Sequence, residues 1–177
     1  MTKLLFLGGP SGSGKSHFCK EYLALKKRWL HLEIDQYPRD GIEEHGLRAE
    51  WDGCYHNLTP EPLHNELLRR AQKSKYVVLS FPGNLIFSDQ HLFAGCQFFS
   101  FAYLYGTPAN CLKAFLEREQ ATPRGLDRAH WDTNNYVAYG LLSRSINHPL
   151  LIQAFDRLGG RRNPQTIYSD IARLMKK

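Results

Sequence analysis

Apolar stretches alternate with segments of helical periodicity along the whole chain, and no internal repeat or low-complexity tract interrupts them. The apolar stretches have the length of strands, and several are apolar almost throughout, as strands covered on both faces of a sheet are. The predicted strands are residues 3–8, 29–35, 75–81, 98–105 and 150–156. Strands that alternate with helices in this way predict a single α/β domain over residues 1–177.

Three of the predicted helices begin with a capping residue followed by proline, a pair that caps a free amide and then fixes the first helical φ. After the last pair, Ile167 and Ile171 recur at helical spacing and are expected to face the core. Near the amino terminus, Phe18, Tyr22 and Leu25 are expected to pack a further helix on the sheet. The three pairs are Thr59-Pro60, Thr107-Pro108 and Asn163-Pro164.

A glycine-rich motif stands between the first predicted strand and the helix that follows it. It satisfies the pattern G-x-x-x-x-G-K-[ST], in which glycines let the backbone wrap around phosphate groups and turn successive amides toward them. Lys15 is expected to reach the β- and γ-phosphates, and the Ser16 hydroxyl to ligate Mg²⁺. ATP and Mg²⁺ are therefore the predicted ligands. The predicted binding residues are Gly9, Pro10, Ser11, Gly12, Ser13, Gly14, Lys15, Ser16 and His17.

The second predicted strand ends on Asp35, at the edge of an open α/β sheet where ligands bind. An aspartate there can accept the proton of a substrate hydroxyl or hold Mg²⁺ through water. The alternative is a capping or surface aspartate. Glu33 alternates with Asp35 and is expected to face the other side. The third strand lacks the terminal aspartate that many phosphate-loop ATPases use as a metal ligand. This absence leaves Ser16, Asp35 and water to hold the metal.

Residues 36–58 form a long polar segment that exceeds a plain connection and is expected to cover a substrate. Two arginines stand against five acidic residues there, a net charge of −3, which disfavours a polyanionic acceptor. Trp51 is expected to anchor this segment by packing, with a stacking platform as the alternative. Asn84, in a tight turn after the third strand, is expected near the acceptor or simply in the turn. The predicted substrate residues are Asp35, Arg39, Arg48, Trp51 and Asn84.

The composition is that of a folded domain. With 42% hydrophobic and 23% charged residues, the chain does not suit a disordered class, and no apolar run approaches the length of a membrane span. The first residues lack the features of a signal peptide. The cysteines contain no C-x-x-C pair, which argues against a zinc cluster or a disulfide framework and favours a reducing cytoplasm.

The net charge of +6 could indicate nucleic acid, an anionic surface or a phosphate-bearing ligand. Its distribution narrows the choice. Residues 15–28 carry five basic side chains against one acidic, and residues 157–177 carry six against one. The basic excess thus surrounds the glycine-rich motif and the chain end, while the segment expected to cover the substrate is acidic. This pattern favours a bound nucleotide over a nucleic acid.

The motif at residues 8–16, the aspartate after the second strand and the segment 102–119 resemble the small P-loop kinases of metabolites. That group includes shikimate kinase, gluconate kinase, chloramphenicol phosphotransferase and the nucleoside kinases. The resemblance implies a three-layer α/β/α fold with a five-stranded parallel sheet in the order 2-3-1-4-5 and ATP at its carboxyl edge. No nucleobase-specific acceptor motif is recognisable, which leaves the acceptor open.

The resemblance also implies a lid whose arginines contact the ATP phosphates, here the segment 117–136. Arg118 and Arg124 fit that role, and Arg128 is a further candidate, although the segment has few arginines for a nucleotide-kinase lid. The chain end implies an adenine-side loop in which Arg162 and Pro164 flank the base.

These features predict an ATP-dependent phosphotransferase that moves the γ-phosphoryl group to a hydroxyl of a small molecule. Asp35 is its predicted base or Mg²⁺-linked residue, and Lys15, Arg118 and Arg124 complete the predicted catalytic set. Two alternatives stay open, a nucleic-acid end kinase and a switch protein that hydrolyses ATP slowly. The sequence does not define the acceptor, a preference for ATP over GTP, or the oligomeric state.

Overall fold

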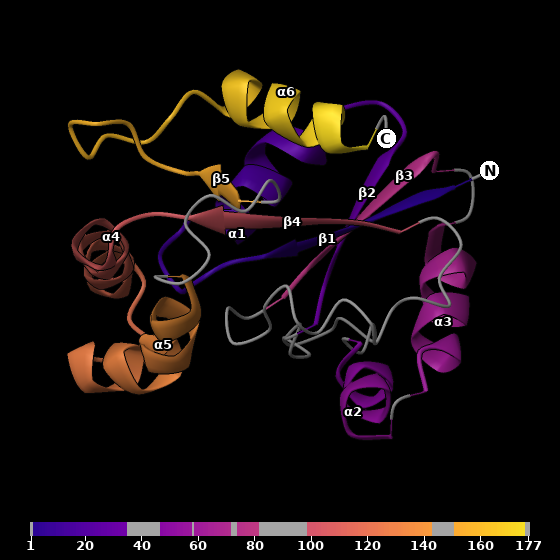
Figure 1. The fold of residues 1–177 in the computed structure, drawn as a ribbon, viewed down its shortest axis with the longest axis horizontal. Coiled ribbons are helices and arrows are strands. Elements are labelled where there is room, and N and C mark those ends of the chain that lie inside the picture. The colour runs from indigo at the N-terminus through magenta and orange to yellow at the C-terminus, as the bar shows by residue number, and fades with distance from the viewer. Residues whose placement is uncertain are drawn as a thin grey trace. The chain divides into compact units, whose positions relative to one another are not determined.

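The computed structural model of the chain (Figure 1) describes residues 2–34, 47–57, 59–71, 74–81, 99–142 and 151–175. Of the predicted site residues, Asp35, Arg39 and Asn84 lie outside these ranges, and the side chain of Arg48 is likewise not described. Among the described residues, no helix is both long and apolar enough to cross a membrane.

Five strands form one parallel sheet in the order β2-β3-β1-β4-β5, flanked by helices in a three-layer α/β/α arrangement (Figure 1). The predicted fold class and strand order are confirmed. Each strand lies within its predicted range, and the carboxyl ends are shorter where the apolar pattern continues into a turn. The strands are β1 (Lys3–Gly8), β2 (Trp29–Glu33), β3 (Tyr76–Ser80), β4 (Phe99–Tyr105) and β5 (Leu151–Gln153).

Helices connect the strands, and two of the three predicted proline-led starts have the expected cap. The Thr107 side chain accepts a hydrogen bond from the amide of Asn110, and the Asn163 side chain accepts one from Gln165. At the third pair, the Thr59 hydroxyl donates to the Gly53 carbonyl at 3.3 Å and α3 begins at Glu61, and the cap at Thr59 stays a prediction. The helical elements are α1 (Lys15–Phe18), the π-helical turn η1 (Cys19–Leu23), α2 (Arg48–Asn57), α3 (Glu61–Ala71), α4 (Pro108–Ala121), α5 (Arg128–Leu142) and α6 (Pro164–Leu174).

The described residues group into two compact units, the first of which contains β1 as far as Leu7 and the chain from Ser16 to Phe81. In this unit β3 pairs with both β1 and β2, and Ser80 lies opposite Leu7 on one side and Glu33 on the other. Side chains alternate along a strand, so His31 and Glu33 share one face of β2. This register places three polar side chains at the carboxyl ends of β2 and β3.

Packing in the first unit agrees with the sequence at Trp51 and differs at Leu25. Trp51 is buried and stacks on Phe81 with 5.2 Å between ring centroids, as expected of a residue that anchors its segment by packing. Phe18 is buried, but Leu25 is 80% exposed, so its predicted core position is wrong. The helical run ends at Leu23, and the turn that follows carries Leu25 away from the core.

The second unit contains Gly8–Lys15 and the chain from Ala102 onward. Its core includes Tyr103, Phe115 and the α6 residues Ile167 and Ile171, which are buried as predicted. Helix α6 packs against β5, and α4 packs against α5. Most of the glycine-rich motif therefore belongs to the same compact unit as α4, α5 and α6.

Candidate nucleotide-binding site

The glycine-rich loop after β1 has a backbone that only glycine adopts easily. Gly12 and Gly14 have φ of +86° and +91°, in the region that side chains disfavour. Space is also lacking, because a methyl group on Gly12 would overlap the Cys111 carbonyl and one on Gly14 would overlap the Arg161 guanidinium. The loop is thus a tight backbone cradle closed by α4 on one side and Arg161 on another.

Lys15 folds back over the start of this loop. Its Nζ donates to the Gly9 carbonyl at 2.6 Å and to the Pro10 carbonyl at 3.2 Å. Ser16 and His17, the next residues of α1, are exposed. A cation inside the loop and accessible residues at the helix start are the arrangement that anion binding requires.

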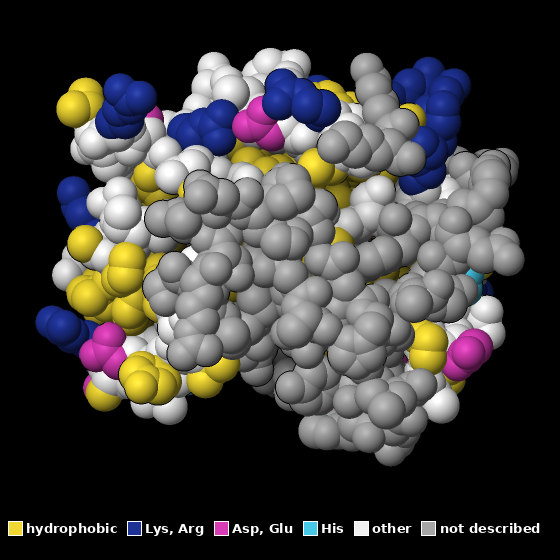
Figure 2. Space-filling model, viewed as in Figure 1, with side chains coloured by type: hydrophobic (Ala, Val, Ile, Leu, Met, Phe, Trp, Pro, Cys, Tyr) yellow, Lys and Arg dark blue, Asp and Glu magenta, His cyan; other side chains and the backbone are white. Residues whose placement is uncertain are grey.

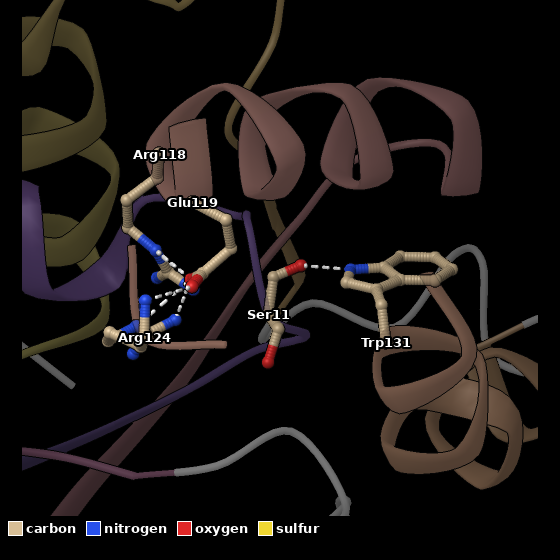
Figure 3. Close-up of polar contacts among 5 residues, drawn as sticks. All are labelled: Ser11, Arg118, Glu119, Arg124 and Trp131. Atoms are coloured by element: carbon tan, nitrogen blue, oxygen red, sulfur yellow. Dashed lines mark hydrogen bonds and ion pairs between the residues drawn. The ribbon is translucent and has the colours of Figure 1, made fainter. Parts of the chain in front are cut away.

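Two side chains of helix α5 bind the backbone of Ser11, one at its amide and one at its carbonyl. Asn135 Oδ1 accepts the Ser11 amide at 2.8 Å, and Trp131 Nε1 donates to the Ser11 carbonyl at 2.9 Å (Figure 3). Asn135 also donates to the Trp131 carbonyl at 2.7 Å, and both side chains are buried. The sequence analysis missed these two residues, since no local pattern distinguishes them from the other polar and aromatic positions of the helix.

Two adjacent arginines before α6 have different partners. Arg161 donates from Nη1 to the Ser13 carbonyl at 2.6 Å and from Nη2 to the Gly12 carbonyl at 2.9 Å. Arg162, the residue predicted beside adenine, donates instead to the Gln153 carbonyl at 2.7 Å and to Asp170 at 3.0 Å. The structure therefore brings Arg161 to the phosphate loop, a role that the sequence did not indicate, and the position of Arg162 beside adenine stays a prediction. Pro164 begins α6.

At the other end of the motif, the Ser16 side chain forms a hydrogen bond with Glu33 of β2. Lys20 Nζ lies 2.9 Å from the same carboxylate. Burial by itself would raise the pKa of Glu33, but the hydrogen bonds from Ser16 and Lys20 outweigh it and keep that pKa below its usual value. Glu33 thus faces the motif, a role that the sequence analysis did not assign.

His31 completes this cluster from the same face of β2. Its Nε2 forms a hydrogen bond with Ser80 Oγ at 2.9 Å and lies 3.9 Å from Glu33. Burial lowers the pKa of His31 to about 4, although the Glu33 carboxylate opposes the shift. The imidazole is therefore neutral at neutral pH. The Ser16 end of the motif thus adjoins a cluster of titratable groups.

The two arginines predicted in the lid meet on one carboxylate. Arg118 Nε donates to Glu119 Oε1 at 3.3 Å, and the Arg124 guanidinium bonds to the same oxygen (Figure 3). Hydrogen bonds from Arg124 lower the pKa of the Glu119 carboxyl. Arg128 pairs separately with Asp132 at 3.4 Å. The structure thus brings Arg118 and Arg124 together and keeps Arg128 apart.

The geometry fits a nucleotide. Gly12 and Gly14 have positive φ in a loop that leaves no room for a Cβ at either position, and Lys15 supplies a cation to it. A strand that enters such a loop and continues into a helix is the phosphate-binding arrangement of P-loop proteins. With the sheet order β2-β3-β1-β4-β5, the chain has a P-loop kinase-like fold.

The chain resembles solved structures of kinases over nearly its whole length. Shikimate kinase from Bacteroides thetaiotaomicron matches with a TM-score of 0.51 and 15% identity over 98% of this chain and 97% of that one. A gluconokinase from Sinorhizobium meliloti 1021 matches with a TM-score of 0.55 and 15% identity over 98% and 94%.

A third similar structure is the Pnkp1/Rnl/Hen1 RNA repair complex, with a TM-score of 0.54 and 15% identity over 81% of this chain. The present chain spans only 46% of the length of that matched chain. No protein-family model and no curated protein matches the sequence. At these identities, the three likenesses establish the fold.

Proposed function

We propose that the protein is an ATP-dependent phosphotransferase that moves the γ-phosphoryl group to a hydroxyl of a small molecule. The observation that carries this proposal is the pre-formed loop, in which Gly12 and Gly14 shape a phosphate cradle and Lys15 lies across it. Such a loop needs little rearrangement when a polyphosphate binds, so the free-energy cost of ordering it is small. The kinase-like fold around it supports transfer over other uses of a nucleotide.

In the proposed reaction, the acceptor's hydroxyl oxygen forms a bond to the γ-phosphorus. The bond from that phosphorus to the β–γ bridging oxygen breaks, and ADP leaves with the electron pair. The acceptor's proton moves to the carboxylate of Asp35, the predicted base. Lys15 holds the β- and γ-phosphates, and Arg118 and Arg124 are proposed to approach them from the lid segment.

Mg²⁺, when bound, would offset the negative charge that develops on the phosphates during transfer. Ser16 is its proposed protein ligand. The Ser16 side chain is hydrogen-bonded to Glu33, and a hydroxyl that donates its proton to a carboxylate keeps its oxygen lone pairs free for a cation. Glu33 therefore suits the orientation of Ser16 that the metal requires.

Ion pairs support a small acceptor over a nucleic-acid strand. In the face drawn in Figure 2, acidic side chains lie among the basic ones. Among the described residues, each of six carboxylates lies close to one or two Lys or Arg cations, which reduces the positive charge available to a row of phosphates. The groups are Lys20–Glu33, Arg69 and Arg70–Glu66, Lys113–Glu117, Arg118 and Arg124–Glu119, Arg128–Asp132, and Arg162 and Arg173–Asp170.

A broad acceptor screen tests the proposal. Purified protein with ATP and Mg²⁺ is mixed with nucleosides, sugars, cofactor precursors, aminoglycoside-like compounds and an oligonucleotide with a free 5′-hydroxyl. Products are identified by mass. We expect one small-molecule class to gain a phosphoryl group and to raise ATP consumption above its basal rate. Phosphorylation of the oligonucleotide alone would indicate an end kinase, and no stimulation by any acceptor would indicate a switch protein.

Two variants connect the activity with the proposed residues. Asp35→Asn is expected to keep nucleotide binding and lose transfer, because the amide cannot accept the proton. Lys15→Ala is expected to weaken both nucleotide binding and transfer. Full activity in both variants would refute the assignment of these residues.

A further inference from the structure

Arg161 is held at the phosphate loop by contacts with Phe155 and with two carbonyl groups of the loop. Its backbone lies opposite Phe155 in an antiparallel bridge, and its guanidinium sits 4.5 Å from the centroid of the Phe155 ring. From there, Nη1 and Nη2 donate to the carbonyls of Ser13 and Gly12 at 2.6 Å and 2.9 Å. One planar fork thus binds two consecutive peptide groups of the loop.

The two bonds determine which way the next amides point. In a planar trans peptide, the carbonyl and the following N–H point in opposite directions. Since the Gly12 carbonyl is directed at Arg161, the Ser13 N–H must be directed away from it. The observed hydrogen bond from the Ser13 amide to the Pro10 carbonyl, at 3.1 Å, agrees with this reasoning.

The same reasoning applies to the next peptide group. The Ser13 carbonyl is bound to Arg161, so the Gly14 N–H points away from the guanidinium. The Pro10 carbonyl, on the side to which these amides point, also accepts a hydrogen bond from Lys15 Nζ. Arg161 therefore turns the Gly14 amide toward the side of the loop that holds the Lys15 ammonium.

The positive charge of Arg161 is not neutralised by a direct ion pair in the described part of the chain. No carboxylate there lies within ion-pair distance of it, whereas the neighbouring Arg162 pairs with Asp170. Glu117 interacts with Arg161 only at longer range. The loop therefore has a cation behind its backbone as well as the cation of Lys15 inside it.

We propose that Arg161 is a positioning residue for phosphate binding, which holds the Gly12–Ser13 and Ser13–Gly14 peptide groups so that the Ser13 amide closes the turn onto Pro10 and the Gly14 amide faces a bound polyphosphate. The inference rests on the proposed function, since it requires the nucleotide's phosphates to occupy this loop. It concerns the fork geometry of arginine and its charge, so a lysine at this position replaces only the charge.

The test measures ligand binding by calorimetry for the wild type, Arg161→Lys and Arg161→Ala. Arg157→Ala is the matched control, because it removes one exposed positive charge from the same turn. The ligands are MgADP, inorganic tripolyphosphate and adenosine. We expect Arg161→Ala to weaken MgADP and tripolyphosphate binding by about tenfold or more, as loss of charge-assisted hydrogen bonds does. Arg161→Lys should recover only part of this loss.

Adenosine and amide exchange separate positioning from general damage to the fold. Adenosine affinity should stay within about twofold in every variant, because it has no phosphate to place. In the ligand-free protein, hydrogen exchange at the Ser13 amide, which is bonded to the Pro10 carbonyl, should accelerate in Arg161→Ala and not in Arg157→Ala.

The possible failures are distinguishable. Equal MgADP and tripolyphosphate binding by the wild type and both Arg161 variants would overturn the inference and leave the proposed function intact. A parallel fall in adenosine affinity would overturn it too, in favour of a purely structural role. Absence of MgADP binding in the wild type would overturn the proposed function, and this inference with it. If Arg161→Ala does not fold, Arg161→Lys decides, since it keeps the charge.

Discussion

The two ends of the phosphate motif are held by different chemistry. Between Ser11 and Ser13, the backbone itself is bound by an amide, an indole and a guanidinium, none of which changes charge near neutral pH. At Ser16 the side chain is bound instead, by Glu33, in a cluster with Lys20 and His31. We therefore expect the stability of the Ser11–Ser13 end to depend on the fit of the backbone and to be insensitive to pH. The stability of the Ser16 end should depend on the protonation of its neighbours.

The largest effect is expected from Gly12→Ala, which disturbs the backbone conformation between Ser11 and Ser13. The new methyl group would overlap the Cys111 carbonyl at a φ of +86°. Because the obstacle is backbone and the conformation is strained for alanine, we expect a loss of about 3 kcal/mol or more in unfolding free energy, with loss of nucleotide binding. Urea denaturation and ADP titration measure the two effects.

Gly140→Ala is the control for this substitution. Gly140 lies within α5, and a methyl group there meets nothing within 4 Å. Alanine is favoured over glycine in a helix, so this variant should keep or gain up to about 1 kcal/mol of stability. If Gly12→Ala were as stable as Gly140→Ala, the loop would not be the tight cradle described.

Acid should act on the second end through His31. Its pKa is held at about 4 in the folded protein and is near 6.5, the ordinary value of a histidine, in the unfolded chain. Since the unfolded chain binds the proton more readily, the contribution of His31 to the unfolding free energy is fully present above about pH 6.5. It falls as the pH drops toward 4, by at most about 3 kcal/mol. Denaturation by urea at several pH values in this window measures the slope.

His31→Gln isolates this contribution, because every other ionisable group is the same in both proteins. The variant should lose part of the slope between about pH 6.5 and 4. Glu33 has a lowered pKa, so its own contribution is present above the unfolded value of 4.5 and is lost only at lower pH, in both proteins. Identical slopes for the wild type and His31→Gln would contradict the buried neutral imidazole.

Helix α5 offers a graded test at the first end. Asn135→Leu leaves the Ser11 amide without its acceptor and the Trp131 carbonyl without its donor, and should cost about 2 kcal/mol. Trp131→Phe removes the donor to the Ser11 carbonyl and part of a buried ring beside Tyr139, and should cost about 1–2 kcal/mol. Both costs should be independent of pH between about 5 and 8, in contrast to the His31 effect. A cost for Asn135→Leu that changed across this range would contradict the difference between the two ends.

The local sequence predicted the strands and the motif, because each depends on neighbouring residues: apolar runs, capping pairs and the glycine spacing. The order of the strands came from the family resemblance. It did not predict what holds the loop. Asn135, Trp131 and Arg161 reach it from 124, 120 and 148 residues away, and no local pattern marks such partners.

Two adjacent positions show why the remaining part of the site was not predictable. Arg161 and Arg162 are chemically identical, and the family resemblance indicated only Arg162, as a residue beside adenine. Neighbouring side chains of an extended segment point to opposite sides, so only the bridge between Arg161 and Phe155 determines which arginine faces the loop. Leu25 is a similar case, since its position depends on where the helical run ends.

The smallest expected effect compares two buried serines, one near each end of the motif. Ser13 Oγ is buried and has no hydrogen-bond partner among the described residues, whereas the buried Ser80 Oγ is bonded to His31. An unpaired buried hydroxyl is costly, so Ser13→Ala should raise the unfolding free energy by about 1 kcal/mol. Ser80→Ala should lower it by about as much, because His31 then loses its partner. Urea denaturation gives both values. A loss of stability in Ser13→Ala would mean that this hydroxyl is hydrogen-bonded in solution. A serine side chain would then be bonded at both ends of the motif, and the difference between the ends would be smaller than described.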